Sequence, residues 1–187
     1  MRVDEIPGLP GLRQIEPTVH TDERGFFLEG YQRDRYREAG VDVEFVQDNH
    51  SGSQEGTLRG LHFQHPHSQG KLVWATAGDV FDVVVDVRVG SPGFGRWYGT
   101  TLAADTHRQL YIPPGFAHGF MVVSEWAEFT YKCTDFYHPE CDNTLLWNDP
   151  EVGVEWPACE PVLSDKDRNG RTLQQLLEEG ALPEYAG

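Results

Sequence analysis

The sequence predicts an all-β protein, an antiparallel sandwich or barrel with short helices. Segments rich in Val, Phe, Tyr, Trp and Thr recur between clusters of turn-forming residues, and the chain carries 20 glycines and 12 prolines. About nine such segments fit the strand spacing of this fold class. The clearest is 79–88, where every second residue from Phe81 to Val87 is apolar, while Asp82 and Asp86 lie on the opposite face.

The expected strands follow one another along the chain, with turn residues between them. They are 43–49, 57–64, 71–76, 79–88, 97–102, 108–113, 119–123, 128–134 and 143–147. A length of 187 residues suits one domain, 1–187, with a substantial core. We expect it to consist of an N-terminal segment (1–50), a barrel core (51–150) and a C-terminal tail (151–187).

Two short helices complete the expected elements, one near the N-terminus and one in the tail. The first is expected at 33–38, with Gly40 just after its end. The second is expected at 172–179, where Thr172 and Gln175 match a capping box.

Charge and cysteine content exclude several classes of partner. A formal net charge of −15 repels nucleic acid and anionic membranes. No stretch approaches the roughly 18 apolar residues that span a bilayer, and the first residues lack the apolar region of a secretion signal, so we expect a cytoplasmic protein. Cys133, Cys141 and Cys159 form no Cys-x-x-Cys pair and fit reduced thiols better than a disulfide framework.

Two motifs resemble the conserved stretches with which metal-binding cupins supply three histidines and a carboxylate to one metal. Gly56 and His62 fit the spacing, but Gln64 stands at the second histidine and the cation Lys71 stands where the carboxylate is expected. His62 and His118 alone fall short of the usual three protein ligands. The motifs therefore predict no metal in this pocket and favour acid/base chemistry.

A more specific resemblance covers nearly the whole chain. The blocks that carry it are 22–27, 46–51, 58–64, 70–73, 91–95, 115–120, 131–132, 147–150 and 163–167. In these blocks the sequence resembles the dTDP-4-dehydrorhamnose 3,5-epimerase family of the cupin superfamily. The resemblance implies a cupin-type jelly roll, a homodimer to which 1–50 contributes, no cofactor, and dTDP-4-dehydro-6-deoxy-D-glucose as substrate.

The chemistry of such an enzyme requires a base, a group that holds an enolate oxygen, and an acid on the opposite face of the sugar ring. By resemblance, His62 is the base and Asp167 the carboxylate that orients it, although from its local sequence Asp167 reads as a solvated turn residue. Lys71 is the cation for the enolate oxygen. Tyr131 is the proton donor, although its strand pattern fits an aromatic core residue equally well, and Tyr137 is the nearest competitor.

Further positions match residues with which the family binds the nucleotide sugar, partly from the partner subunit. They are Arg24, Glu29, Gln47, Asn49, Arg59, His118, Tyr137, Asp142 and Lys166. Asp142 replaces a family glutamate and is one methylene shorter, so we expect its contact to be lost or carried by water. Strict strand alternation would place Arg59 and His62 on opposite faces, which predicts a β-bulge at Gly60.

Several functions remain open at this point. The leading one is epimerisation at C3 and C5, giving dTDP-4-dehydro-L-rhamnose for dTDP-L-rhamnose biosynthesis. A single-centre epimerase, acting at C3 or C5 for an antibiotic deoxysugar, has the same expected fold and residues. A metal cupin oxygenase is disfavoured by Gln64 and Lys71. A non-catalytic sugar-binding cupin is disfavoured because a mere binder has no need of a base, an oxyanion cation and an acid together.

Overall fold

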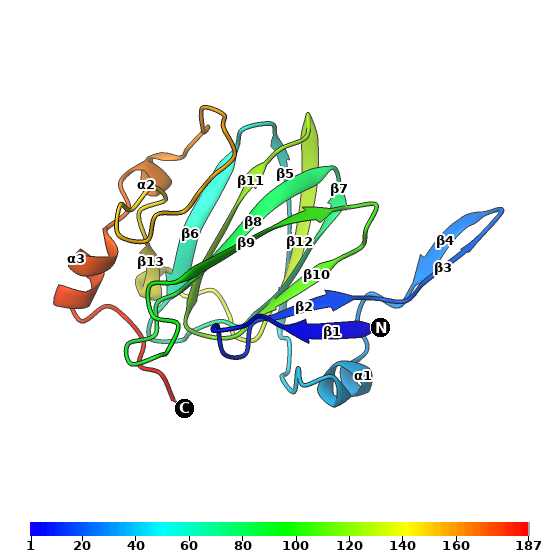
Figure 1. Ribbon diagram of the computed structural model, residues 1–187, viewed down its shortest axis with the longest axis horizontal. Coiled ribbons are helices and arrows are strands. Elements are labelled where there is room, and N and C mark those ends of the chain that lie inside the picture. The colour runs from blue at the N-terminus through cyan, green and yellow to red at the C-terminus, as the bar shows by residue number, and fades with distance from the viewer. Residues whose placement is uncertain (187) are drawn as a thin grey trace.

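The computed structural model describes residues 1–186, and most of its strands form two sheets that face each other (Figure 1). The six-stranded sheet has the order β1 (Arg2–Glu5), β2 (Arg13–Glu16), β10 (Gln109–Ile112), β7 (Lys71–Ala77), β12 (Trp126–Cys133), β5 (Gln47–Gln54). The five-stranded sheet has the order β13 (Asp142–Thr144), β6 (Leu58–Gln64), β11 (Phe116–Val122), β8 (Asp79–Asp86), β9 (Trp97–Ala103). Neighbouring strands of these sheets run antiparallel, which confirms the predicted fold class.

A separate hairpin of β3 (Val19–Asp22) and β4 (Gly25–Leu28) projects away from the two sheets (Figure 1). Its tip carries two large apolar side chains in solvent, since Phe26 is 61% and Phe27 71% exposed. Within a single chain, these two aromatic side chains of the hairpin therefore stay largely exposed to solvent.

The helices are short and their caps follow from the sequence. α1 (Arg33–Glu38) and α3 (Leu173–Glu178) lie where they were predicted, and α3 starts with the expected capping box of Thr172 and Gln175. A one-turn helix, α2 (Asp165–Arg168), and a 3₁₀ turn, η1 (Pro139–Cys141), were not predicted. None of the helices within residues 1–186 is long and apolar enough to cross a membrane.

Three apolar clusters hold these layers together. The first fills the space between the sheets and draws on both of them, with members that include Val73, Leu110, Phe129, Val84 and Phe120. The second covers the outer face of the five-stranded sheet with the C-terminal tail, and its members include Leu61, Val83, Val85, Leu173 and Leu176. The third packs α1 on the outer face of the six-stranded sheet through Ile15, Tyr36, Val41, Leu72 and Tyr111.

The predicted alternation in β8 is confirmed, and both of its faces prove to be buried. Val83 and Val85 contribute to the cluster under the tail, whereas Val80 and Val84 contribute to the core between the sheets. Asp82, on the inner face of the strand, is fully buried. A buried carboxylate needs a partner, and this one faces the functional site described below.

Some strand boundaries differ from the prediction. β5 begins at residue 47 instead of 43, because Val43 and Phe45 pack against the α1 cluster without joining a ladder. β11 begins at Phe116 instead of 119, and β13 ends at Thr144 instead of 147. The four strands β1 to β4 were not predicted, because each is only four residues long and β1 to β3 are mostly polar.

Neighbouring leucines in α3 give a matched test of the tail's contribution to stability. Leu176 is fully buried, whereas Leu177 is 45% exposed. We expect Leu176→Ala to lower the free energy of unfolding by about 2–5 kcal/mol, because it leaves a cavity in a packed core. Leu177→Ala should cost less than about 1 kcal/mol. Denaturant unfolding measures both, and equal losses would contradict this account of the tail.

Candidate active site

A cavity of about 260 Å³ opens between the two sheets and receives side chains from both of them and from the C-terminal tail. Its lining residues are Ser51, Arg59, His62, Lys71, His118, Phe120, Tyr131, Ser164 and Asp167. We call it the inner pocket. An outer pocket of about 150 Å³ shares His62, Lys71 and Tyr131 with it. The outer pocket is also lined by Phe63, Gln64, Gln69, Tyr137, Asp142 and Lys166.

The predicted bulge in β6 brings Arg59 and His62 into the same pocket. Opposite β11, His62 pairs with His118 and Arg59 pairs with Phe120, so β6 carries one extra residue between the two pairs. Gly60 has φ +135°, and a Cβ there would lie 2.5 Å from the Cα of Gly119. A glycine is therefore required at the bulge both by its backbone conformation and by the close approach of β11.

His62 forms a hydrogen-bonded pair with Asp167. Its Nε2 lies 2.5 Å from Oδ1 of Asp167, and the Ser164 hydroxyl donates to Oδ2 at 2.7 Å. Ser164 is also the N-cap of α2, so the first turn of this helix presents the carboxylate to the histidine. With the Nε2 proton directed to Asp167, Nδ1 is the ring nitrogen left to accept a proton.

Asp167 is a buried carboxylate, only 4% exposed, and not the solvated turn residue that its local sequence suggests. Burial alone would raise its pKa, but hydrogen bonds from His62, Ser164 and the Gly60 backbone outweigh burial and hold the pKa below 3.8. The carboxylate is therefore ionised at neutral pH and stabilises positive charge on the imidazole.

Lys71 begins β7 and lines both pockets. Within residues 1–186 no carboxylate oxygen lies within 4 Å of its ammonium group. Lys71 therefore forms no salt bridge there, and its positive charge is available to a ligand in the pocket. Burial lowers the pKa of Lys71 from its usual value near 10.5, and the nearby Cys133, Asp142 and Asp82 only partly oppose this shift. The ammonium lies 5.8 Å from the ring centroid of Tyr131.

Tyr131 lies on β12, which pairs with β7 on one side and with the edge strand β5 on the other. Its ring packs against the core between the sheets and also lines both pockets, so its packing fits an aromatic core residue and its role as proton donor stays a prediction. Burial raises the pKa of the phenol above its usual value near 10. The hydroxyl is therefore protonated at neutral pH and can act as an acid.

A second histidine–aspartate pair lies behind the first. His118 Nε2 is 2.8 Å from Oδ2 of Asp82, and both side chains are buried. Among the described residues, the other oxygen of Asp82 has no hydrogen-bond partner. The pair fixes the His118 ring at the wall of the inner pocket. Asp82 was not predicted as a member of the site, because the alternation in β8 only placed it on the face opposite the apolar residues.

The outer pocket joins several predicted binding residues through hydrogen bonds. The Tyr137 hydroxyl donates to Oδ2 of Asp142 at 2.9 Å, and Lys166 forms an ion pair with the same oxygen. The shorter side chain of Asp142 is thus held inside the site. Gln47 and Asn49 are bonded to each other on β5, and Gln47 accepts a hydrogen bond from the Tyr137 backbone.

Arg24 and Glu29 are predicted binding residues that a single chain leaves apart from both pockets and from the residues bonded to them. Arg24 lies in the turn of the projecting hairpin, where its 85% exposed side chain pairs with Asp22. Glu29 follows the hairpin and pairs with Arg35 of α1. Neither residue lines the inner or the outer pocket.

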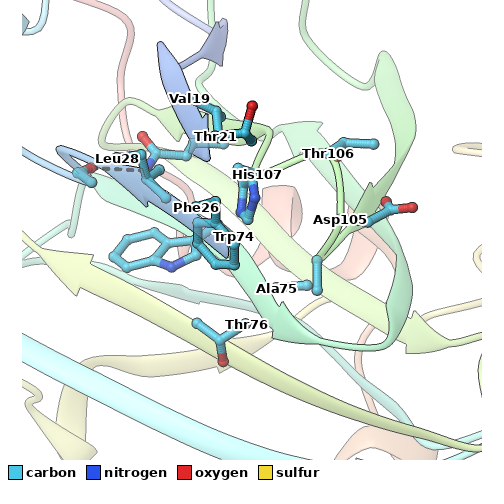
Figure 2. A pocket seen from close by; sticks show the side chains of 13 residues that line it. Val19, Thr21, Phe26, Leu28, Trp74, Ala75, Thr76, Asp105, Thr106 and His107 are labelled. Carbon is cyan, nitrogen blue, oxygen red and sulfur yellow. Dashed lines mark hydrogen bonds between the residues drawn. The ribbon is translucent and has the colours of Figure 1, made fainter. Parts of the chain in front are cut away.

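Beneath the hairpin lies a larger groove of about 820 Å³ that carries none of the predicted catalytic residues. Figure 2 shows its apolar lining, with Phe26 and Leu28 from the arm facing Trp74 on β7 and His107 from the loop before β10. Asp105 and His107 are the titratable residues of its lining and neither is buried, so we regard the groove as a packing surface.

The inner and outer pockets are poor in metal ligands. His62 and His118 each bond a carboxylate, Lys71 adds a positive charge, and the amide of Gln64 is used in bonds to neighbouring backbone. Within residues 1–186, one group of three His, Cys, Asp or Glu side chains has its ligand atoms within 4.8 Å of one another, and it lies outside both pockets.

Comparison with known proteins agrees with this arrangement. The family model described as dTDP-4-dehydrorhamnose 3,5-epimerase matches residues 7–175. An enzyme of that description from Pseudomonas aeruginosa is 55% identical over 167 residues, which cover 88% of this chain and 92% of the relative.

Two solved structures show the same fold. A dTDP-6-deoxy-D-glucose-3,5-epimerase from Legionella pneumophila, in complex with dTDP-4-keto-L-rhamnose, has a TM-score of 0.94 and 48% identity and covers 100% of this chain and 99% of its own. A 4-keto-6-deoxy sugar epimerase from the novobiocin gene cluster of Streptomyces spheroides has a TM-score of 0.95 and 39% identity, with coverage of 100% and 94%. The predicted cupin-type jelly roll is confirmed, and the chain belongs to the dTDP-4-dehydrorhamnose 3,5-epimerase family.

Proposed function

We propose that this chain is an isomerase that epimerises C3 and C5 of dTDP-4-dehydro-6-deoxy-D-glucose, giving dTDP-4-dehydro-L-rhamnose for dTDP-L-rhamnose biosynthesis. The observation that carries the proposal is the convergence of His62, Lys71 and Tyr131 on both pockets, with Asp167 bonded to the histidine. These side chains supply a base, a cation and an acid in one cavity. The family of the chain and the ligand of the Legionella relative support the same reaction.

The first step is removal of a proton from carbon. The ketone at C4 acidifies the hydrogens on C3 and C5, because the electron pair left behind delocalises onto O4 as an enolate. Nδ1 of His62 takes the proton, and the ionised Asp167 stabilises the imidazolium that forms. The Lys71 ammonium holds the enolate oxygen, where preorganised charge is worth on the order of 3 kcal/mol.

The second step returns a proton to the opposite face of the ring. The Tyr131 hydroxyl donates it to the carbon, the enolate electrons form the new C–H bond, and the C4 ketone is restored. Both protein groups then exchange protons with water, and the cycle repeats at the other carbon. Because only protons move, the reaction needs neither an oxidant nor a reductant.

The nucleotide is held by local cations in a chain that is otherwise strongly acidic. Arg59 at the inner pocket and Lys166 at the outer pocket suit the diphosphate, since guanidinium and ammonium groups form charge-assisted hydrogen bonds with phosphate oxygens. Tyr137, which is 54% exposed, can stack on the base, and Gln47 and Asn49 lie beside it for polar contacts. His118 contacts the sugar or the phosphate from the wall of the inner pocket.

A second copy of the chain completes the site in this proposal. The groove beneath the hairpin and the exposed Phe26 and Phe27 suit burial against an identical arm in a symmetric dimer. Such a dimer would carry Arg24 and Glu29 of one subunit to the pocket of the other. Residues 1–50 then act as the dimer segment of one domain, 51–150 as its barrel and 151–187 as its covering tail.

The cellular compartment is part of the same proposal. Cys133, Cys141 and Cys159 are all free thiols. Free thiols persist in a reducing compartment, and we place the reaction in the cytoplasm.

Deuterium exchange tests the function directly. In D₂O without added metal, the chain should incorporate deuterium at both C3 and C5 of dTDP-4-dehydro-6-deoxyglucose, as followed by NMR, because each reprotonation draws on exchangeable protons. His62→Ala should reduce exchange by at least about 10²-fold while nucleotide binding is nearly unchanged.

His50→Ala is the control for this experiment, since His50 is exposed and bonds only Glu128. Exchange at one carbon alone would establish the single-centre reaction. Nucleotide binding without deuterium exchange would establish a sugar-binding cupin. Normal exchange in His62→Ala would refute the assignment of His62 as the base.

The pH dependence of kcat tests Lys71. The lysine acts as a cation, and its pKa lies below 10.5, so kcat should fall as the pH rises through this lowered value. The raised pKa of Tyr131 keeps the acid protonated over the same range. Lys71→Arg should lower kcat, because the guanidinium has a different shape, but move the basic limb to higher pH, because arginine stays charged. If kcat of Lys71→Arg falls at the same pH as kcat of the wild type, the decrease at high pH belongs to another group.

Hybrid dimers test the contribution of the arm. Arg24→Ala should weaken substrate binding by about 10- to 150-fold, because an arginine–phosphate hydrogen bond is worth about 1.5–3 kcal/mol. A dimer with one His62→Ala subunit and one Arg24→Ala subunit contains one intact site if Arg24 acts across the interface, so it should recover about half of the wild-type activity.

Two differently tagged subunits allow the hybrid dimer to be purified, and light scattering gives its mass. No recovery in the hybrid would place Arg24 in its own subunit's site, and unweakened substrate binding in the Arg24→Ala homodimer would place it outside both sites. A monomeric mass for the active wild-type protein would exclude the dimer.

A further inference from the structure

Two loops beside the outer pocket bring together three metal-ligating side chains that have no part in the proposed reaction. They are His67 in the loop between β6 and β7, and Asp135 and His138 in the segment after β12. One ligand atom of each lies within 4.8 Å of the other two. We propose that these three residues form a binding site for a divalent transition-metal ion such as Zn²⁺.

The backbone behind these side chains is fixed by one buried amide. The side-chain NH₂ of Gln64 donates to the carbonyl oxygens of His67 at 2.8 Å and Phe136 at 3.1 Å. Its oxygen accepts from the backbone N–H of His138 at 2.8 Å. Gln69 adds a bond from its side chain to the Asp135 carbonyl at 2.8 Å. The two loops are thus held together from behind, and the ligand groups need little backbone movement to converge.

The ligand atoms are close to the distances that zinc requires. Zinc–nitrogen and zinc–oxygen bonds of about 2.0–2.2 Å place tetrahedral ligand atoms roughly 3.4 Å apart. Nδ1 of His67 and Oδ2 of Asp135 already lie 3.4 Å apart. The rings of His67 and His138 are stacked with centroids 4.3 Å apart, and one ring nitrogen of each already lies within 4.8 Å of the other. Glu140, whose carboxylate lies 3.4 Å from His138, offers a fourth ligand.

The donor set selects the class of ion. Two imidazoles and a carboxylate suit zinc, nickel and copper, whereas Mg²⁺ and Ca²⁺ prefer oxygen ligands alone. The net charge of −15 also favours a cation over an anion at this surface. The sequence predicted no metal ligand, because the three residues come from loops far apart in the chain and only the fold brings them together.

The site would restrain the segment that carries Tyr137. This tyrosine lies between two of the ligands, Asp135 and His138, and its hydroxyl bonds Asp142 in the outer pocket. A bound ion would cross-link the segment to the loop of His67 and so preorganise the aromatic ring. Provided that Tyr137 binds the nucleotide as proposed above, Zn²⁺ should lower KM and leave kcat unchanged.

Metal titration of the full chain tests the site without reference to activity. The protein is freed of metal with a chelator, and ZnSO₄ and CoCl₂ are added separately, with calorimetry for the first and visible absorption for the second. We expect one ion per chain and a cobalt spectrum of a four-coordinate site. His67→Ala and His138→Ala should each weaken zinc binding by at least about tenfold, because the loss of a residue that only hydrogen-bonds to a metal ligand already has an effect of this size. MgCl₂ should give no binding.

His50→Ala is the matched control, because it removes an exposed histidine elsewhere and should leave zinc affinity unchanged. Circular dichroism checks that the variants fold. Absence of zinc binding to the wild type, or equal affinity in the wild type and both loop variants, would overturn the site. Zinc binding at this site with an unchanged KM would overturn only the link to Tyr137. Failure of epimerisation in metal-free and zinc-loaded protein alike would instead count against the proposed reaction.

Discussion

The close approach of β6 and β11 at Gly60 and Gly119 is the constraint on which the site depends. A side chain at either position would meet backbone of the opposite strand at less than 3 Å, so the bulge can form only between glycines. The bulge adds one residue to β6 and thereby turns Arg59 and His62 into the same cavity. It also helps to hold Asp167, because the Gly60 backbone bonds that carboxylate.

The charges of the pocket complement one another once the fold is formed. Asp167 is ionised beside His62, whereas Lys71 faces the cavity without a salt bridge to any residue in the range 1–186. Burial lowers the pKa of Lys71 and raises the pKa of Tyr131, because the pocket disfavours a charge on either group. A site of this kind favours an anionic intermediate over a neutral substrate.

Gln64 affects both the pocket inside the barrel and the proposed metal site on the loops beside it. At this position an amide replaces a histidine in the barrel, and its three hydrogen bonds organise the loops of His67 and His138 outside it. In the proposed reaction, the pocket inside the barrel serves proton transfer. Metal-ligating side chains instead gather on the surface next to Tyr137, where an ion would act on binding and not on chemistry.

The sequence by itself determined the elements that have strong local patterns. Period two in β8, the capping box of α3 and the glycine at the bulge were all predicted, because each depends on residues close together in the chain. The residues proposed for the reaction were predicted from family motifs. The tertiary structure decided the rest, since the burial of Asp167 depends on contacts with a strand more than a hundred residues away. It also decided the separation of Arg24 from the pocket and the meeting of His67 with His138, because spatial proximity across loops leaves no periodic signal.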